Sequence, residues 1–273
     1  MIVVDESKLQ ASHITLPVSY WQQGNEQVQS QFDCVAEEVP IAMVYNGISH
    51  AVMMASPANL HEFALGFSLS EGIINNVTEI YDVEFVSSEK GIEVQIEISA
   101  KRMMSLKSHR RNLTGRTGCG LCGSESLETA IRPIKSVMQQ ALPSSKIIQY
   151  ALSQLHKHQK LQALTGAVHG AAWCNTTGKI TLLCEDVGRH NALDKLIGRL
   201  ALRKINTQRG FVIISSRASY EMVQKVTSVN IATLIAVSAP TGLAITLANQ
   251  ANLNLVGFAR SGRHTFYTQF DKE

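Results

Sequence analysis

The pattern of apolar and polar positions divides the chain into two parts with different rhythms. In the first part, Val39–Tyr45 and Ile48–Met54 have the composition of strands, and Asn46-Gly47 between them is typical of a hairpin turn. Ser56-Pro57 begins a predicted helix that ends near Gly72. Its apolar face holds Leu60, Phe63, Ala64 and Phe67. Strict alternation over 92–98 indicates a further, half-buried strand. The sequence therefore predicts a smaller α+β domain over residues 1–110.

The second part, residues 111–273, alternates strands with helices. The predicted elements are the hairpin Ala171–Cys174 with Lys179–Cys184, helix Arg189–Lys204, strand Phe211–Ile214, helix Ser219–Ser228, strand Ala232–Val237, helix Thr241–Asn249 and strand Leu253–Phe258. Alternating elements of this kind predict an α/β domain whose mixed sheet is largely parallel and covered by helices. Ligands of such sheets bind outside the carboxyl ends of the strands. Polar residues gather at those ends, namely at 184–186, 215–217, 238–240 and 260–263.

Composition and charge narrow the class of protein. The chain is 45% hydrophobic and 17% charged, which excludes a disordered or collagen-like chain. No signal peptide is visible and the five cysteines are scattered, so we expect a cytoplasmic protein with reduced thiols. The run between Lys225 and Arg260 lacks formal charge, but Pro240 and Gly242 interrupt it. It therefore predicts a buried strand–helix–strand unit rather than a membrane span. Neither a membrane nor a nucleic acid is expected as a partner.

The strongest chemical signal is the pair Cys119 and Cys122 in a glycine-rich segment, 115–123. Six basic residues and no acid precede it over 101–116, a block typical of a solvated loop, a helix face or an anion-attracting patch. Nearby positive charge favours the thiolate, which is the nucleophile in attack on sulfur. A sulfur relay on a mobile loop, a zinc site and a dithiol oxidoreductase are the three interpretations. No second cysteine pair or spaced histidine pair completes a zinc site, so no metal is expected. Cys34, Cys174 and Cys184 are expected to be core residues.

Further polar clusters indicate an anionic, nucleotide-like ligand. The first, 185–195, holds Asp186, Arg189 and His190, which we expect to bind the ligand. In the alternative interpretation Asp186 caps a helix and Asp194 and Lys195 lie on a solvated face, which leaves Arg189, His190 and Asn191 unexplained. His169 stands in a segment of small residues and is either structural or ligand-binding. A strand-to-helix junction carries Ser215, Ser216 and Arg217, which suit a phosphate. The last predicted strand ends in the segment Phe258, Ala259, Arg260, Ser261, Gly262 and Arg263. The two arginines suit binding of a pyrophosphate, and the ring of Phe258 suits stacking on a base.

These segments resemble the formate dehydrogenase accessory sulfurtransferases, the FdhD family. The resemblance runs in order from about residue 35 to the C-terminus. It is carried by 115–123, 165–169, 185–195, 215–225, 238–241 and 255–260.

The resemblance implies a sulfurtransferase that passes sulfur from a cysteine desulfurase to bis-molybdopterin guanine dinucleotide before this cofactor enters formate dehydrogenase. It implies a persulfide on Cys119 with Cys122 as its partner, and guanine dinucleotide binding by 258–263. It also implies a homodimer and a cytidine-deaminase-like fold for the larger domain. Deamination itself is not expected, because Ala171 stands where a zinc deaminase needs glutamate and the cysteine pair precedes His169. A cofactor-binding chaperone without sulfur transfer and a zinc-binding protein are the alternatives.

Overall fold

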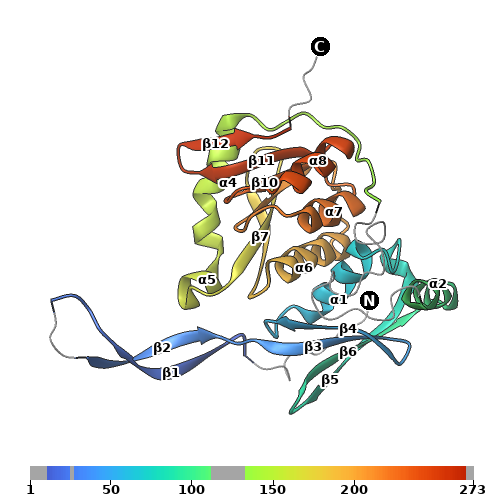
Figure 1. Ribbon diagram of the computed structural model, residues 1–273, viewed down its shortest axis with the longest axis horizontal. Helices are drawn as coiled ribbons and strands as arrows, with labels where there is room; N and C mark the ends of the chain where they lie inside the picture. Colours follow the sequence, from blue (N-terminus) through green and yellow to red (C-terminus); the bar gives the residue numbers. More distant parts are fainter. Residues whose placement is uncertain (1–10, 25–27, 112–132, 269–273) are drawn as a thin grey trace.

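The computed structural model describes residues 11–24, 28–111 and 133–268 (Figure 1). These residues form a two-stranded ribbon, a four-stranded sheet and a six-stranded sheet. The ribbon consists of β1 (His13–Tyr20) and β2 (Gln29–Ala36), which were not predicted.

The four-stranded sheet has the order β4-β3-β6-β5. Its strands are β3 (Val39–Tyr45), β4 (Ile48–Ala55), β5 (Ile80–Ser88) and β6 (Gly91–Ile98). The predicted hairpin is confirmed, because Asn46 and Gly47 both have positive φ (46° and 77°) and join β3 to β4. Helix α1 (Leu60–Ser70) buries its predicted apolar face in the core of this sheet. The turn η2 (Val77–Glu79) precedes β5.

The basic segment after the sheet begins as a helix, α2 (Ala100–Arg111), which is one of the forms expected for this block. Met103 on this helix is buried in the core of the four-stranded sheet, which explains why the segment folds back onto it. Arg102 Nε lies 2.8 Å from Glu79 Oε1. The remainder of the segment, with Cys119 and Cys122, lies outside the described residues. The domain boundary near residue 110 stays a prediction.

The six-stranded sheet has the order β12-β11-β10-β9-β7-β8. Its strands are β7 (His169–Asn175), β8 (Ile180–Asp186), β9 (Gly210–Ile214), β10 (Thr233–Ala236), β11 (Asn254–Arg260) and β12 (Arg263–Phe266). Only the pairs β9–β10 and β10–β11 are parallel, so the expectation of a largely parallel sheet is wrong. Hairpins at both ends are the reason: β7 lies antiparallel to β8 and β9, and β12 turns back along β11. The coarser expectation of a mixed α/β fold is confirmed.

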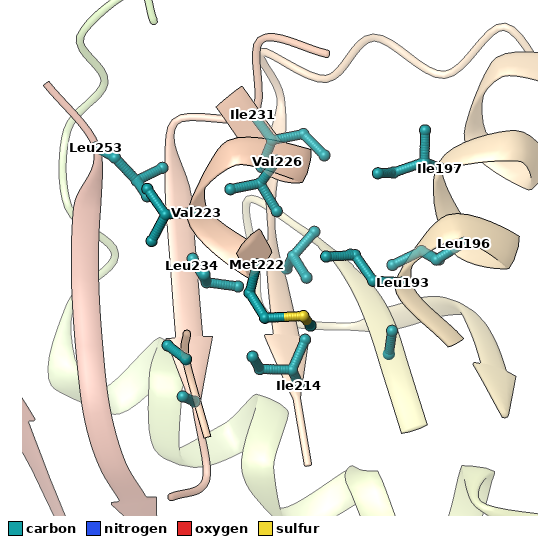
Figure 2. Packing of buried hydrophobic residues seen from close by; sticks show 14 of the residues in the cluster. Leu193, Leu196, Ile197, Ile214, Met222, Val223, Val226, Ile231, Leu234 and Leu253 are labelled. Atoms are coloured by element: carbon teal, nitrogen blue, oxygen red, sulfur yellow. The ribbon is translucent and has the colours of Figure 1, made fainter. Parts of the chain in front are cut away.

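Helices cover both faces of this sheet. One face packs against α6 (Arg189–Leu202), α7 (Tyr220–Ser228) and α8 (Gly242–Gln250), and the other against α4 (Ser145–His158), followed by α5 (Lys160–Thr165). Figure 2 shows Leu193 of α6, Met222 of α7 and Ile214 of β9 in the first layer. Along β9, Val212 and Ile214 point to that layer while Phe211 and Ile213 point to the other. Burial on both faces explains the uninterrupted apolar strand.

The uncharged run between Lys225 and Arg260 forms β10, α8 and β11, as predicted. No helix in the described part of the chain has the length and apolar character needed to cross a membrane.

The two large sheets are joined through α1 and α6, which cross at very short distance (Figure 1). The crossing depends on two glycines. A Cβ atom on Gly66 would stand 1.7 Å from the Asp194 carbonyl oxygen, and one on Gly198 would stand 1.9 Å from that of Glu62. Beside the crossing, Arg199 Nη2 pairs with Glu62 Oε1 at 2.9 Å. The contact therefore fixes the start of α6 relative to the first sheet.

Candidate functional site

The carboxyl ends of the strands at which polar residues gather in the sequence lie side by side in the structure. Strands β8, β9, β10 and β11 point in the same direction, so their carboxyl ends share one edge of the sheet. Backbone hydrogen bonds join the loops that follow: Ser238 N donates to Ser216 O at 3.4 Å, and Phe258 N donates to Ser238 O at 3.1 Å. We call this edge, with the residues that follow each strand, the carboxyl edge.

Three helices begin at the carboxyl edge. Helix α6 follows Gly188, α7 follows Ser219 and α8 follows Thr241. The N-terminus of a helix carries partial positive charge and unpaired N–H groups, which attract anions. At these starts, Arg189 Nε and Ser219 Oγ are buried without a hydrogen-bond partner among the described residues. Buried polar atoms are rarely left unpaired, so both atoms are available to a ligand.

His169 begins β7 at the same edge and faces Asp186 across the β7–β8 pair. Its neighbour Gly170 is bonded in both directions to Ser215: Gly170 N donates to Ser215 Oγ and Ser215 N donates to Gly170 O, each at 2.9 Å. Partial burial lowers the pKa of His169, and the positive charge of Arg189 and the nearby His190 lower it further. The ring is therefore neutral at pH 7, beside a positively charged arginine.

His190 is held by a residue that the prediction of the site did not include. Its Nε2 lies 2.8 Å from Glu221 Oε2 in the first turn of α7. This hydrogen bond is the main reason that the pKa of Glu221 is lowered. The signal was available, because Glu221 falls within the 215–225 segment at a predicted helix start, where acids are favoured.

Asp186 has an interior role. The side chain is fully buried, and its oxygens accept hydrogen bonds from Gly188 N at 2.7 Å and Ser56 N at 3.1 Å, as well as from Lys195 Nζ. It therefore shapes the loop before α6 and ties it to the first sheet. Asp186 thereby holds the start of α6 in place at the carboxyl edge.

The expectation that Asp194 and Lys195 lie on a solvated face is wrong, because they are 1% and 0% exposed. Lys225 Nζ lies 2.9 Å from both Asp194 carboxylate oxygens and 2.9 Å from Glu71 Oε1. Burial alone would lower the pKa of Lys225, but the carboxylates of Asp194 and Glu71 outweigh it and raise the pKa above its ordinary value. These residues of the quoted segments join the two sheets instead of facing a ligand.

The segment 258–263 forms the far end of the carboxyl edge. Residues Arg260, Ser261, Gly262 and Arg263 are exposed in the β11–β12 turn, whereas Ala259 is buried in the core. Gln149 of α4 holds the turn, since Gly262 N donates to its Oε1 at 2.9 Å. Within the described residues, no ion pair involves the guanidinium groups of Arg217, Arg260 and Arg263.

Phe258 has an unusual backbone conformation. Its φ is 48°, in the left-handed region that a bulky residue seldom adopts, and its side chain is 38% exposed. A register shift in the β11–β12 pair lies between Gly257 and Arg260. Strained residues of this kind concentrate at binding sites. Phe258 is not a core residue, and its exposed ring is accessible for stacking.

The carboxyl edge is long. Four strand spacings separate β8 from β11, which corresponds to about 19 Å at the usual distance between strands. The edge thus joins histidine, arginine and helix starts at one end to an exposed aromatic ring and two arginines at the other. This arrangement suits an extended, polyanionic ligand with a planar group. Whether each residue binds one stays a prediction.

The described cysteines are not reactive centres of the edge. Burial raises the pKa of the Cys184 thiol to about 12 and raises that of Cys174 well above its ordinary value. Both are core residues, as expected. Cys34 is half-buried in β2, so the expectation of a core residue is wrong there. In the described ranges, no group of three His, Cys, Asp or Glu side chains is arranged to hold a metal ion.

Comparisons with known proteins agree on one family. Residues 36–272 match the FdhD/NarQ family. The chain is 52% identical over 256 residues to the sulfur carrier protein FdhD of Cupriavidus necator, a match that covers 94% of this chain and 88% of that protein. Among solved structures, a protein of Desulfotalea psychrophila described as a formate dehydrogenase accessory protein has the same fold. Its TM-score is 0.70 at 24% identity, over 96% of this chain and 99% of that one.

Proposed function

The chain belongs to the FdhD/NarQ family, and on that premise we propose that it is a sulfur carrier for formate dehydrogenase. In this proposal it accepts sulfur from a cysteine desulfurase and passes it to bis-molybdopterin guanine dinucleotide, which it binds as cargo before the cofactor enters the dehydrogenase. We place it in the cytoplasm as a homodimer, and we assign the six-stranded unit a cytidine-deaminase-like fold. Ala171, where a deaminase would need glutamate, is buried in the core.

The sulfur step belongs to Cys119. Its thiolate attacks the outer sulfur of the persulfide on the desulfurase, a new sulfur–sulfur bond forms, and the desulfurase cysteine leaves as thiolate. Cys122 then either accepts the outer sulfur in turn or attacks the inner sulfur of Cys119. In the second case the two cysteines become a disulfide and the outer sulfur leaves as sulfide. The basic residues that precede the pair favour the thiolate form.

The observation that carries the cargo site is the carboxyl edge. Unpartnered Arg189 Nε and Ser219 Oγ lie where helices begin, and the exposed Phe258 ring lies toward the other end. In the proposed complex the helix starts and the exposed arginines hold the phosphates. Phe258 stacks on guanine, and the neutral His169 lies beside the anionic part of the cargo.

The sulfur step is tested by intact-mass spectrometry after incubation with a cysteine desulfurase and cysteine. The wild-type chain should gain one sulfur, and Cys119→Ala should gain none. Cys34→Ala is the matched control, because it removes a half-buried cysteine outside the pair and should gain sulfur as the wild type does. Full sulfur loading of Cys119→Ala contradicts the role of this residue.

A chaperone that binds the cofactor without carrying sulfur is the second candidate, because the described residues that form the carboxyl edge include neither cysteine. The double variant Cys119→Ala/Cys122→Ala separates the two. A carrier without its cysteines should leave formate dehydrogenase inactive, whereas a chaperone should still support it.

A further inference from the structure

The β1–β2 ribbon extends away from the two large sheets, and β2 contacts α5. Its two strands pair antiparallel from His13↔Ala36 to Tyr20↔Gln29 without a register shift. In Figure 1 the strands β1 and β2 extend sideways, away from both large sheets. Among the described residues, no third strand pairs with either edge.

The ribbon is apolar for a segment so exposed. Phe32 is 75% exposed, Trp21 63%, Leu16 42% and Ile14 40%. A two-stranded hairpin is marginally stable in water, and independent stability requires a third strand or a packed face. These exposed side chains therefore indicate that another surface covers the ribbon.

The two edges of the ribbon differ. Pro17 stands in β1 opposite Phe32. Proline occupies an edge strand with its nitrogen toward the open side, so a strand added next to β1 would lack a hydrogen-bond donor there. Because antiparallel pairs alternate, the N–H groups of Phe32, Ser30 and Cys34 then point to the open side of β2. Cys34 N–H agrees, since it donates to its neighbour Asp33 Oδ1 at 2.9 Å instead of to β1. The open edge is therefore Ser30 to Phe32.

The near absence of charge on the ribbon favours a second copy of the chain as the partner that covers it. In the two strands Asp33 is the only residue with a formal charge at pH 7, so the ribbon offers little to a strongly basic or acidic partner. Its exposed neutral edge can meet itself across a twofold axis without bringing like charges together. A twofold contact uses the same patch on both copies, which the open β2 edge supplies.

We propose that β2 pairs antiparallel with β2 of a second copy, with the twofold axis next to Gln31, so that the two ribbons form one four-stranded sheet. Ser30 of each copy then lies opposite Phe32 of the other, and each exchanges backbone hydrogen bonds. The two Phe32 rings lie diagonally on one face and shield each other from water. This inference deepens the homodimer proposed above and adds its interface.

Sedimentation equilibrium of the full chain tests the proposal. Phe32→Glu places a charge on the open edge and should raise the dimer dissociation constant at least ~10-fold, because charged side chains on edge strands oppose pairing. Ile14→Glu is the matched control on β1, because Ile14 is exposed and lies opposite the uncharged Val35. It should change the dissociation constant less than ~2-fold, since single exposed substitutions are nearly neutral. Circular dichroism of both variants should match the wild type, because neither residue belongs to a core cluster.

Disulfide trapping fixes the register. Gln31→Cys should form a disulfide between copies, because cysteines facing each other across such a pair have the required separation. Ser19→Cys on β1 should not, and peptide mapping identifies the linked residues. Linked Gln31→Cys peptides together with the Phe32→Glu effect support the proposal. A monomeric wild type overturns both the homodimer and its interface. A dimer that Phe32→Glu leaves intact, with no Gln31→Cys link, overturns the interface alone.

Discussion

Phe258 shows what the sequence does and does not reveal about a single residue. Its position at the end of a predicted strand marked it as a candidate for stacking on a base. Its positive φ, however, follows from the irregular pairing of β11 with β12 and has no sequence signal, because phenylalanine does not favour this conformation.

Replacing Phe258 separates strain from binding. Phe258→Ala and Phe258→Gly both remove the ring, so each should weaken binding of GDP about tenfold through lost stacking. Glycine adopts positive φ at little cost, so Phe258→Gly should be more stable to urea than Phe258→Ala by about 1 kcal/mol. Calorimetric titration and urea unfolding measure the two effects. Unchanged GDP affinity in both variants would remove Phe258 from the site.

His169 gives the site a dependence on pH. Its lowered pKa leaves the ring neutral without ligand, and the phosphates of a bound nucleotide raise that pKa. The protonated form therefore binds more tightly, and affinity for GDP should rise as the pH falls through the pKa of the ring in the bound state, by up to tenfold for each unit by which binding raises that pKa. GDP phosphates titrate nearby as well, so the comparison with His169→Gln is decisive. The variant should show the shallower dependence, and identical profiles would exclude His169 from the anion site.

At the scale of elements, the sequence predicted the parts that have strong periodicity. Strands β3, β4, β6 and β9 and helices α1, α6, α7 and α8 were all predicted, because each either buries one regular face or is short and wholly apolar. The pattern missed β1, β2 and β12, which are mostly exposed. It also missed α4, although the buried residues Ile148, Ala151, Leu152 and Leu155 of this helix follow regular helical spacing. The six-stranded sheet has antiparallel pairs at both ends because hairpins lie there. The order of strands in a sheet is set by tertiary packing, and local sequence patterns do not reveal it.

The crossing of α1 and α6 depends on glycine. From the sequence alone, Gly66 and Gly198 are residues of low helix propensity inside two helices. In the structure, each lies where another backbone approaches within the radius of a methyl group. Gly66→Ala and Gly198→Ala should each lower the free energy of unfolding by about 3 kcal/mol or more, since the clash is with backbone and not with a movable side chain.

Gly242→Ala is the control for this prediction, because no heavy atom lies within 4 Å of its added Cβ atom. Its stability should stay within about 0.5 kcal/mol of the wild type. Urea unfolding of the three variants gives the comparison. Equal stability of Gly66→Ala and Gly242→Ala would show that the helices separate without cost.

At the scale of the whole molecule, the quoted segments serve two purposes that the sequence could not separate. Arg189, His190 and Ser215 reach the carboxyl edge, whereas Asp186, Asp194 and Lys225 are buried between the two sheets. Both groups stand in the same short segments at helical spacing. The packing of α1 against α6 separates the two groups, and that contact joins residues far apart in the sequence.

In the proposed function, one molecule accepts sulfur at Cys119 and delivers it to a cofactor held at the carboxyl edge. This transfer can be followed with radioactive sulfur from labelled cysteine, through a cysteine desulfurase and this protein, into bis-molybdopterin guanine dinucleotide. We expect label in the cofactor with the wild type, none with Cys119→Ala, and label retained on the protein with Arg217→Ala/Arg260→Ala. Label that reaches the cofactor at the wild-type rate without Cys119 would contradict it.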